Sequence, residues 1–239
     1  MTADSVVRTL AADGFAHISL SGHPKEDCPE LERRLRALGR PIHVFLRQPF
    51  WKPMKSDPAR PPGRSGGVGF NSLHIDCVNV ERPPDILVLY CVQQDPRGGG
   101  ANLVAVTDGL EQALPEPTLN LLATTPVSEG AAYDLDEVGG DLNPFYVYSA
   151  ESRWPWRYSG RMLTSSIRQH KADFVEALTE LDQALLHRSQ LIPLATGDAL
   201  FIDQRRTLHG RLPLGPGQDD VPEERRRDLV QAFARAPGV

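Results

Sequence analysis

Apolar residues recur at helical spacing near the start of the chain and again in its last third. The first residues predict a short helix that ends near Ala12, before a turn at Asp13-Gly14. The segment DCPELERRLRALGR predicts a second helix, because its leucines recur at helical spacing, Asp27 is a suitable N-cap and Gly39 is a C-terminal stop. A third helix, expected to cover a sheet, is predicted from about His170 to His187.

Between these helices, short runs of apolar and β-branched residues alternate with turn signals. One run extends from Phe15 to Ser19. Further runs lie between Leu73 and Val106, separated by ERPPD and DPRGGG, and QLIPL and ALFID follow the third helix. The segment from Arg227 to Arg235 predicts a last strand. Many short strands with few helices indicate a mainly β fold, a β-sandwich or jelly roll with flanking helices.

The segment from Trp51 to Gly69 contains too many helix and strand breakers for a regular element. Its prolines and glycines are Pro53, Pro58, Pro61, Pro62, Gly63, Gly66, Gly67 and Gly69. A loop of this length in a compact domain is either an ordered binding loop or lid, or a disordered segment. The sequence leaves both alternatives open.

Length and charge narrow the class of protein. With 239 residues, of which 40% are hydrophobic, the chain can bury a substantial core, and we expect one domain over residues 1–239. The formal net charge of −5 argues against a broad basic face for nucleic acid. We therefore expect a small molecule rather than a nucleic acid as the partner, and the sequence does not indicate an oligomeric state.

Cysteine usage and the lengths of the apolar runs indicate the compartment. Cys28, Cys77 and Cys91 include no close pair, which favours neither a disulfide framework nor a thiolate zinc site. The first residues lack the basic and apolar stretches of a secretory signal. The longest apolar run, Ile86 to Val92, is far shorter than the roughly 18 residues of a membrane span. We expect a cytoplasmic protein without a membrane partner.

A candidate metal site begins with His74 and Asp76, which are two positions apart in the segment NSLHIDCVNV. In a strand, residues at this spacing leave the same face, so one imidazole and one carboxylate can share a metal ion. A His-x-Asp triplet also arises by chance, and an exposed or capping pair is the alternative. His209, in IDQRRTLHGRLP, supplies the second imidazole that an iron(II) site with two histidines and one carboxylate requires.

The chain resembles the taurine dioxygenase superfamily, and within it the clavaminate synthase-like iron(II)/2-oxoglutarate oxygenases. The similar segments are LHIDCVNVERPPDILVLYCVQQDPRGGGANLV, GDALFIDQRRTLHGRLP and RRRDLVQAF. The resemblance implies a double-stranded β-helix (jelly-roll) core with the metal at its open mouth. It also implies Fe²⁺, 2-oxoglutarate and O₂ as cofactor and co-substrates, release of succinate and CO₂, and oxidation of an unactivated C–H bond.

A co-substrate with a distal carboxylate is well matched by an arginine on a rigid strand. In the predicted last strand Arg227 shares a face with Leu229, Gln231 and Phe233, and the family pattern of an Arg followed four residues later by a polar group matches Arg227 and Gln231. Arg226 is the fallback, and a solvated run of charges is the alternative.

The family's threonine after the glycine turn is replaced by Asn102, whose amide can also donate. The turn itself, Gly98 to Gly100, is interpreted as a loop that requires unusual backbone angles, not as a phosphate cradle. Arg205, Arg206 and Asp203 precede His209 in the sequence. They either orient the metal ligand or the co-substrate through hydrogen bonds, or form a structural salt bridge.

Substrate residues are expected next to the metal strand and in RWPWRYSGRMLTSS. Phe70 and Asn71 precede His74. Aromatic walls and cationic donors, as suit an amino-acid-like or natural-product substrate of secondary metabolism, are combined in Trp154, Trp156, Arg157, Tyr158 and Arg161. An aromatic cluster that packs the flank of the barrel is the alternative. The intact Asp76 argues against halogenation and leaves hydroxylation as the default outcome, on a substrate that is free or tethered to a carrier protein.

Two other functions remain open at this stage. One is a metal-dependent enzyme without redox chemistry on a cupin-like jelly roll, which would not need Arg227. The other is a non-catalytic ligand-binding domain that keeps the fold.

Overall fold

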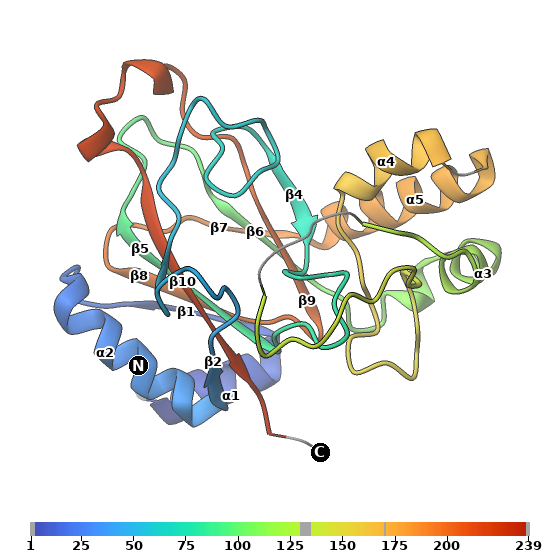
Figure 1. Cartoon of the computed structure of the whole chain (residues 1–239), viewed down its shortest axis with the longest axis horizontal. Coiled ribbons are helices and arrows are strands. Elements are labelled where there is room, and N and C mark those ends of the chain that lie inside the picture. Colours follow the sequence, from blue (N-terminus) through green and yellow to red (C-terminus); the bar gives the residue numbers. More distant parts are fainter. Residues whose placement is uncertain (1–2, 130–134, 170, 238–239) are drawn as a thin grey trace.

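The computed structural model describes residues 3–129, 135–169 and 171–237. Its strands form two antiparallel sheets (Figure 1). The larger sheet has the order β1 (Phe15–Ser19), β8 (Asp198–Asp203), β5 (Ile86–Gln93), β10 (Asp228–Arg235) and β2 (Arg40–Ile42), and the short β3 (Lys52–Pro53) also pairs with β10. The smaller sheet has the order β4 (Asn71–His74), β9 (Thr207–Arg211), β6 (Asn102–Val106) and β7 (Gln190–Ile192).

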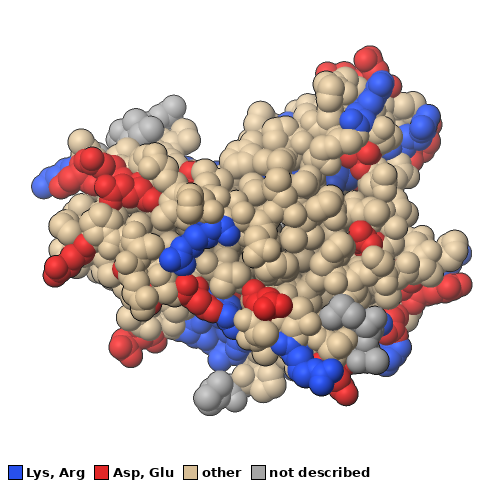
Figure 2. Space-filling view, turned by 180° about the vertical axis from the view of Figure 1, so that it is seen from behind, with Lys and Arg blue, Asp and Glu red and all other residues tan. Residues whose placement is uncertain are grey.

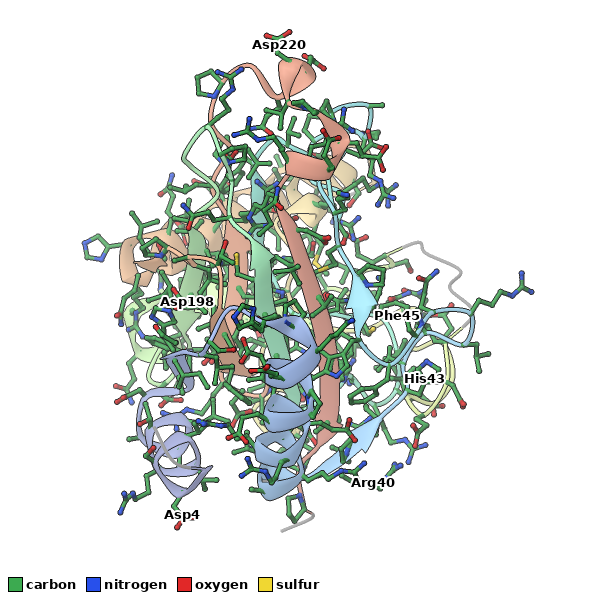
Figure 3. The ribbon with its side chains drawn as sticks, turned by 90° about the vertical axis from the view of Figure 1, so that its left-hand side faces the viewer. Asp4, Arg40, His43, Phe45, Asp198 and Asp220 are labelled. Atoms are coloured by element: carbon green, nitrogen blue, oxygen red, sulfur yellow. The ribbon has the colours of Figure 1, made fainter. Side chains whose placement is uncertain are left out.

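Helices cover the outer faces of both sheets. The helices α1 (Ala3–Asp13) and α2 (Pro24–Leu38) lie against the larger sheet, as Figures 1 and 3 show from two directions. The helices α3 (Glu116–Thr124), α4 (Arg161–Gln169) and α5 (Ala172–Arg188) lie on the side of the smaller sheet. Three short 3-10 helices, Glu111–Ala113, Gln218–Asp220 and Glu223–Arg225, complete the regular structure of the described chain.

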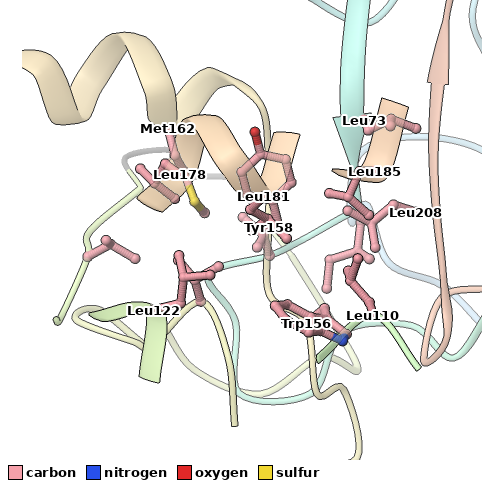
Figure 4. Close-up of a cluster of buried hydrophobic side chains, with 14 of the residues drawn as sticks. Leu73, Leu110, Leu122, Trp156, Tyr158, Met162, Leu178, Leu181, Leu185 and Leu208 are labelled. Carbon is pink, nitrogen blue, oxygen red and sulfur yellow. The ribbon is translucent and has the colours of Figure 1, made fainter. Parts of the chain in front are cut away.

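Alternation along the strands divides the buried residues into three clusters. Ile86, Val88 and Tyr90 of β5 pack under α1 and α2, whereas Leu87 and Leu89 of the same strand point toward the smaller sheet. Outside the smaller sheet, its outward residues pack with the three later helices (Figure 4). The layers are therefore helices, larger sheet, smaller sheet and helices, with an apolar core between the two sheets.

Most of the predicted elements are present, the helices α3 and α4 were not predicted, and the second helix needs a correction. This helix begins at Pro24, so Asp27 lies inside it and is not the N-cap. The Asp27 carboxylate instead accepts hydrogen bonds from Ser21, from the backbone N–H of Gly22 and from the buried Tyr90 hydroxyl, and these contacts lower its pKa against the effect of burial. The third predicted helix is α5, and its expected first residue, His170, lies outside the described residues.

The proline- and glycine-rich segment follows an ordered path in the structure. Its backbone forms turns, among them Asp57 N–H to Gly66 O at 2.7 Å and Gly67 N–H to Arg64 O at 2.9 Å. Of the two alternatives that the sequence left open, the structure therefore supports an ordered binding loop. This loop is the segment whose side chains reach the cavities described below.

The surface carries charges of both signs. On the face shown in Figure 2, Lys and Arg side chains lie beside Asp and Glu side chains around a broad uncharged area. Within the described residues, no helix combines the length and apolar character needed to cross a membrane.

Candidate functional site

Inward-facing polar residues of the two sheets meet in a small cavity of about 70 Å³. The alternation of strand side chains explains this, because Leu208 of β9 faces the outer helices while His209 and Arg211 face inward. The larger sheet contributes residues of β10 at alternate positions. The polar residues that line the cavity include His74, Asp76, Asn102, His209, Arg211, Arg227 and Gln231.

His74, Asp76 and His209 form a compact cluster at this cavity. Each offers one ligand atom, and the three atoms all lie within 4.8 Å of one another. The Asp76 carboxylate lies 3.7 Å from His74 Nε2 through Oδ1 and 3.6 Å from His209 Nε2 through Oδ2. The pairing of β4 with β9 explains the arrangement, since His74 and His209 are direct partners in that register.

Hydrogen bonding and burial in the cluster suit a divalent metal. Nδ1 of His74 lies 2.8 Å from the carbonyl of Ser72, which leaves Nε2 free to bind a metal. Burial, assisted by the neighbouring His74, lowers the pKa of His209 to about 3, so that imidazole is neutral at pH 7. Asp76 Oδ2 is buried without a hydrogen-bond partner in the described structure. A neutral His209 imidazole, a His74 imidazole with its Nε2 unengaged and an orphaned carboxylate oxygen fit an iron(II) site with one open face.

Gln204 holds the carboxylate ligand in place and was not anticipated from the sequence. Its Oε1 accepts a hydrogen bond from the backbone N–H of Asp76 at 2.7 Å, and its Nε2 donates to the carbonyl of Pro84 at 3.1 Å. Gln204 is only 1% exposed. The contact joins the turn after β8 to the turn after β4, and no sequence spacing signals it.

Arg227 lies in the same cavity as the cluster, at the position expected for an anion-binding residue. It is 7% exposed, and burial lowers its pKa. Across the described chain its guanidinium makes one long hydrogen bond, 3.5 Å to the carbonyl of Gly100, and no ion pair. A buried guanidinium with unused donors is costly without an anion. The distal carboxylate of 2-oxoglutarate fits this requirement through paired hydrogen bonds.

The glycine turn leaves room for this arginine. Gly98, Gly99 and Gly100 all have positive φ, at 73°, 90° and 65°, as the interpretation of unusual backbone angles requires. A Cβ on Gly100 would lie 2.5 Å from Leu214 Cδ2 and 3.3 Å from Arg227 Nε. The turn therefore sets the position of the guanidinium.

Asn102 and Gln231 also line the small cavity. The Asn102 amide donates one hydrogen bond, 3.3 Å to the carbonyl of Ile192, and is 3% exposed. Leu229 and Gln231 of β10 follow Arg227, which lies directly before the strand, at alternate positions along the cavity, and Gln231 lies where the small cavity meets a larger one. The structure thus brings both residues to the place where the sequence predicted a co-substrate site, and their roles stay predictions.

Arg211 is a further buried cation at the cavity that the sequence analysis missed. Its guanidinium donates to the carbonyls of Gly67 and Gly69 at 2.6 and 2.7 Å, which ties the proline- and glycine-rich loop to β9. Burial and the nearby Arg227 lower its pKa to about 10. Its place two residues after His209 was the available signal, because residues at that spacing share a strand face.

Arg205, Arg206 and Arg226 do not line the small cavity, whereas Arg64 of the proline- and glycine-rich loop does. Arg226 points away from it and donates to the carbonyl of Val221 at 3.1 Å, so it is a poor substitute for Arg227. Arg205 forms a two-point ion pair with Asp203 at 2.8 and 2.6 Å, so of the two alternatives the structure supports the structural salt bridge. Arg206 pairs with the exposed Asp108 and the end of α1.

A larger cavity of about 500 Å³ opens next to the metal cluster. Asn71, His74 and Asp76 line one part of it, and Phe45, labelled in Figure 3, lines another. Its charged lining side chains, apart from the metal cluster, are Lys52, Arg60, Arg64, Glu129 and Arg161. The prediction that the Trp51–Gly69 loop contributes to binding is consistent with this lining, but Glu129 was not anticipated.

Of the substrate residues expected from the sequence, Asn71 lines both cavities. Phe70 is 40% exposed and lines neither cavity. The Arg157 guanidinium is buried and donates to the carbonyls of Val78, Val80 and Glu81, all at 3.0 Å or less.

Tyr158 is fully buried in the outer core, and its hydroxyl donates to Asp182 at 2.7 Å. Neither Arg157 nor Tyr158 lines a cavity of the site. The expectation of substrate contacts from these two residues is corrected, since both pack the flank of the sheet. Arg161, further along the same segment, does line the larger cavity.

Comparison with solved structures identifies the fold. An asparagine oxygenase in complex with Fe(II), 2S,3S-3-hydroxyasparagine and succinate has a TM-score of 0.75 and 18% identity, over 97% of this chain and 77% of that one. The non-heme iron oxygenase OrfP in complex with Fe and alpha-ketoglutaric acid has a TM-score of 0.65 and 16% identity, over 98% and 79% of the two chains. The expected double-stranded β-helix fold is confirmed.

OrfP in complex with Fe, succinate and (3S)-hydroxy-L-Arg is similar at a TM-score of 0.67 and 17% identity, over 98% of this chain and 79% of that chain. A search among curated protein sequences gave no match.

The family model of taurine catabolism dioxygenases, TauD and TfdA, matches residues 50–232. This range includes the metal cluster, the glycine turn and Arg227, and it extends over most of the chain. The enzyme class predicted from the sequence, a dioxygenase that uses Fe²⁺, 2-oxoglutarate and O₂, is confirmed at the level of this family. The chain belongs to the taurine catabolism dioxygenase TauD, TfdA family.

Proposed function

We propose that this protein hydroxylates an unactivated C–H bond of a small amino-acid-like substrate, at a metal held by His74, Asp76 and His209. The observation that carries the proposal is the proximity of this cluster to the buried Arg227, which has no ion-pair partner in the described chain. A metal site alone would also serve a non-redox enzyme. A cluster of two histidines and one carboxylate beside an unneutralised guanidinium suits an oxygenase with an anionic co-substrate.

The overall reaction balances without a further reductant. The substrate C–H, 2-oxoglutarate and O₂ give the substrate C–OH, succinate and CO₂. O₂ is the oxidant and takes up four electrons, two from the oxidative decarboxylation of 2-oxoglutarate and two from the substrate C–H bond, and iron(II), when bound, would activate O₂ for this reaction. The residues of this chain bind and orient the participants, and they limit the access of water.

Each residue has a separate task in this proposal. His74, Asp76 and His209 hold the metal on one side, and Gln204 fixes the backbone that carries the Asp76 carboxylate. Arg227 binds the distal carboxylate of the co-substrate, and Asn102 of β6 and Gln231 of β10 add amide donors from the two facing sheets. The substrate would bind in the larger cavity, beside Asn71 and next to the metal-binding residues His74 and Asp76.

An amino-acid-like substrate is supported by the cavity and by the relatives. The cavity of about 500 Å³ lies within the range of small-molecule sites and carries charges of both signs. The similar structures contain hydroxylated asparagine and hydroxylated arginine. We further propose that residues 1–239 form one oxygenase domain that acts in the cytoplasm, where its three free cysteines would stay reduced.

Oxygen-dependent succinate formation tests the proposal. Protein reconstituted anaerobically with Fe²⁺ and 2-oxoglutarate is exposed to air with a panel of free and carrier-linked amino acids, and succinate and substrate mass are measured together. We expect succinate in proportion to a mass gain of one oxygen. A protein that binds metal but forms no succinate with any member of the panel would instead be the non-redox metal enzyme or the non-catalytic domain.

A further inference from the structure

The larger cavity contains a carboxylate whose charge is not used within the protein. Oε1 of Glu129 is buried and has no hydrogen-bond partner in the described structure. The backbone of Glu129 is fixed, because its carbonyl accepts from Asn79 at 2.9 Å and from Asn143 at 3.1 Å. A carboxylate oxygen that is buried without a partner is costly, which points to a cationic ligand that supplies the missing donor.

Two arginines of the same cavity are also uncommitted. The guanidinium groups of Arg64 and Arg161 make no hydrogen bond or ion pair among the residues described, although both line the cavity. Both lie near enough to favour the charged form of Glu129, whose pKa burial raises, yet neither is within 4.0 Å of its carboxylate. Opposite charges held apart across a cavity leave room for a ligand that carries both signs.

The other cations of the cavity have partners already. The Lys52 ammonium lies 3.6 Å from the centre of the Phe45 ring and in the field of the Asp76 carboxylate. Arg60 donates to the carbonyl of Ser65 at 2.9 Å and lies 3.7 Å from the Asp57 carboxylate. The uncommitted charges are therefore two guanidinium groups and one carboxylate.

We propose that the substrate is an α-amino acid with a second carboxylate, bound with its ammonium at Glu129 and its two carboxylates at Arg64 and Arg161. This inference rests on the proposed function, because it concerns the substrate of the same site. One ammonium and two carboxylates match the uncommitted charges one to one. A substrate with a neutral amide, such as free asparagine, would leave one guanidinium without an anion. Free arginine as substrate would place a further cation beside that guanidinium.

Competition between acids and their amides tests the substrate class. L-Aspartate, L-glutamate and L-2-aminoadipate are compared with L-asparagine, L-glutamine and L-arginine by succinate formation and mass gain. We expect kcat/KM for at least one acidic amino acid to exceed that of its amide by about 10- to 100-fold, the usual effect of a charge-assisted hydrogen bond. Equal or faster turnover of the amides or of arginine would overturn the inference and leave the proposed function intact.

A variant and a modified substrate test the ammonium contact together. Wild type should prefer the free acidic amino acid over its N-acetyl derivative, which has no ammonium. In Glu129→Gln we expect KM for the free amino acid to rise about 10-fold or more, and the preference over the N-acetyl form to shrink by a similar factor. A merely structural role of Glu129 would lower activity on both forms and keep their ratio, and an unchanged ratio would overturn the assignment.

Matched controls separate this inference from the proposed function. Arg64→Gln and Arg161→Gln should reduce discrimination between acid and amide, whereas Arg8→Gln and Glu176→Gln, at exposed positions on α1 and α5, should not. The visible absorption of the iron(II)–2-oxoglutarate complex under anaerobic conditions shows whether the co-substrate still binds. If wild type binds the co-substrate but turns over no acidic amino acid, this inference is refuted and the proposed function stands. If wild type does not bind 2-oxoglutarate, the proposed function is refuted.

Discussion

The Oδ2 atom of Asp76 lies 3.6 Å from Nε2 of His209 and is buried without any hydrogen-bond partner in the described structure. Such an arrangement costs folding free energy in the absence of a cation, because a buried carboxylate oxygen has lost its water. This unfavourable carboxylate lies where the two sheets meet. We expect metal binding to offset its cost, so that removing the charge of Asp76 should stabilise the metal-free protein but weaken metal binding and activity.

Asp76→Asn should therefore separate stability from metal binding. The metal-free variant is expected to be at least as stable as metal-free wild type, because it removes a buried charge. Its affinity for Fe²⁺ should fall by more than the roughly 10- to 100-fold that is typical when a residue behind a metal ligand is removed. Thermal unfolding with and without Fe²⁺ measures both effects, and a variant less stable than wild type without metal would contradict the account.

His209 predicts a specific pH dependence of the metal-free protein. Its pKa in the folded state is about 3, below the value near 6.5 of an unfolded histidine, so the unfolded state binds more protons between these values. Stability from this group is complete above pH 6.5 and falls as the pH is lowered toward 3, by about 2 kcal/mol at pH 5.

Urea unfolding of metal-free wild type and His209→Gln at pH 7 and pH 5 tests this dependence, and the variant should lose less stability between the two pH values. Equal losses in both proteins would show that His209 titrates normally in the folded state.

Arg227→Ala should raise the KM for 2-oxoglutarate by about 100-fold or more while Fe²⁺ binding is kept, because a charge-assisted two-point contact is lost. Arg226→Ala is the matched control, since its side chain contacts the Val221 carbonyl outside the cavity. Succinate formation against 2-oxoglutarate concentration measures the effect. If Arg226→Ala raised the KM for 2-oxoglutarate more than Arg227→Ala, the inward and outward side chains at the start of β10 would be exchanged relative to the structure.

Gly100→Ala should damage both folding and co-substrate binding. Gly100 has φ +65°, and a Cβ there would approach Leu214 to 2.5 Å and Arg227 Nε to 3.3 Å. We expect a loss of about 1–3 kcal/mol of stability and a raised KM for 2-oxoglutarate. Gly98→Ala serves as the control, because its φ is +73° but nothing lies within 4 Å of its Cβ. Gly98→Ala should lose stability through backbone strain but keep the wild-type KM for 2-oxoglutarate. Equal KM values for 2-oxoglutarate in the Gly98 and Gly100 variants would contradict this role of the turn.

Strand alternation made the central part of the site predictable from the sequence. The two-residue spacing grouped His74 with Asp76, although Asp76 lies in the turn just after β4, and alternate spacing grouped Arg227, directly before β10, with Gln231 in β10. The late His209 was expected as the third member, and the register of β4 with β9 places it there.

Residues from loops could not be predicted in this way. Glu129, Arg64 and Gln204 reach the site through turns whose paths depend on tertiary contacts, and no periodicity marks them. Arg157 and Tyr158 were misplaced because a cation beside aromatic residues has the same pattern in a packed flank as in a binding site. Only the partners of their polar atoms distinguish the two situations.

Isotope labelling tests the central claim most directly. Turnover under ¹⁸O₂ with iron-loaded protein, 2-oxoglutarate and an oxidised substrate should place one labelled oxygen in succinate and one in the hydroxylated product. His74→Ala should abolish both. Product whose new oxygen comes from water, formed without labelled succinate, would contradict the assignment of this site as a 2-oxoglutarate-dependent oxygenase.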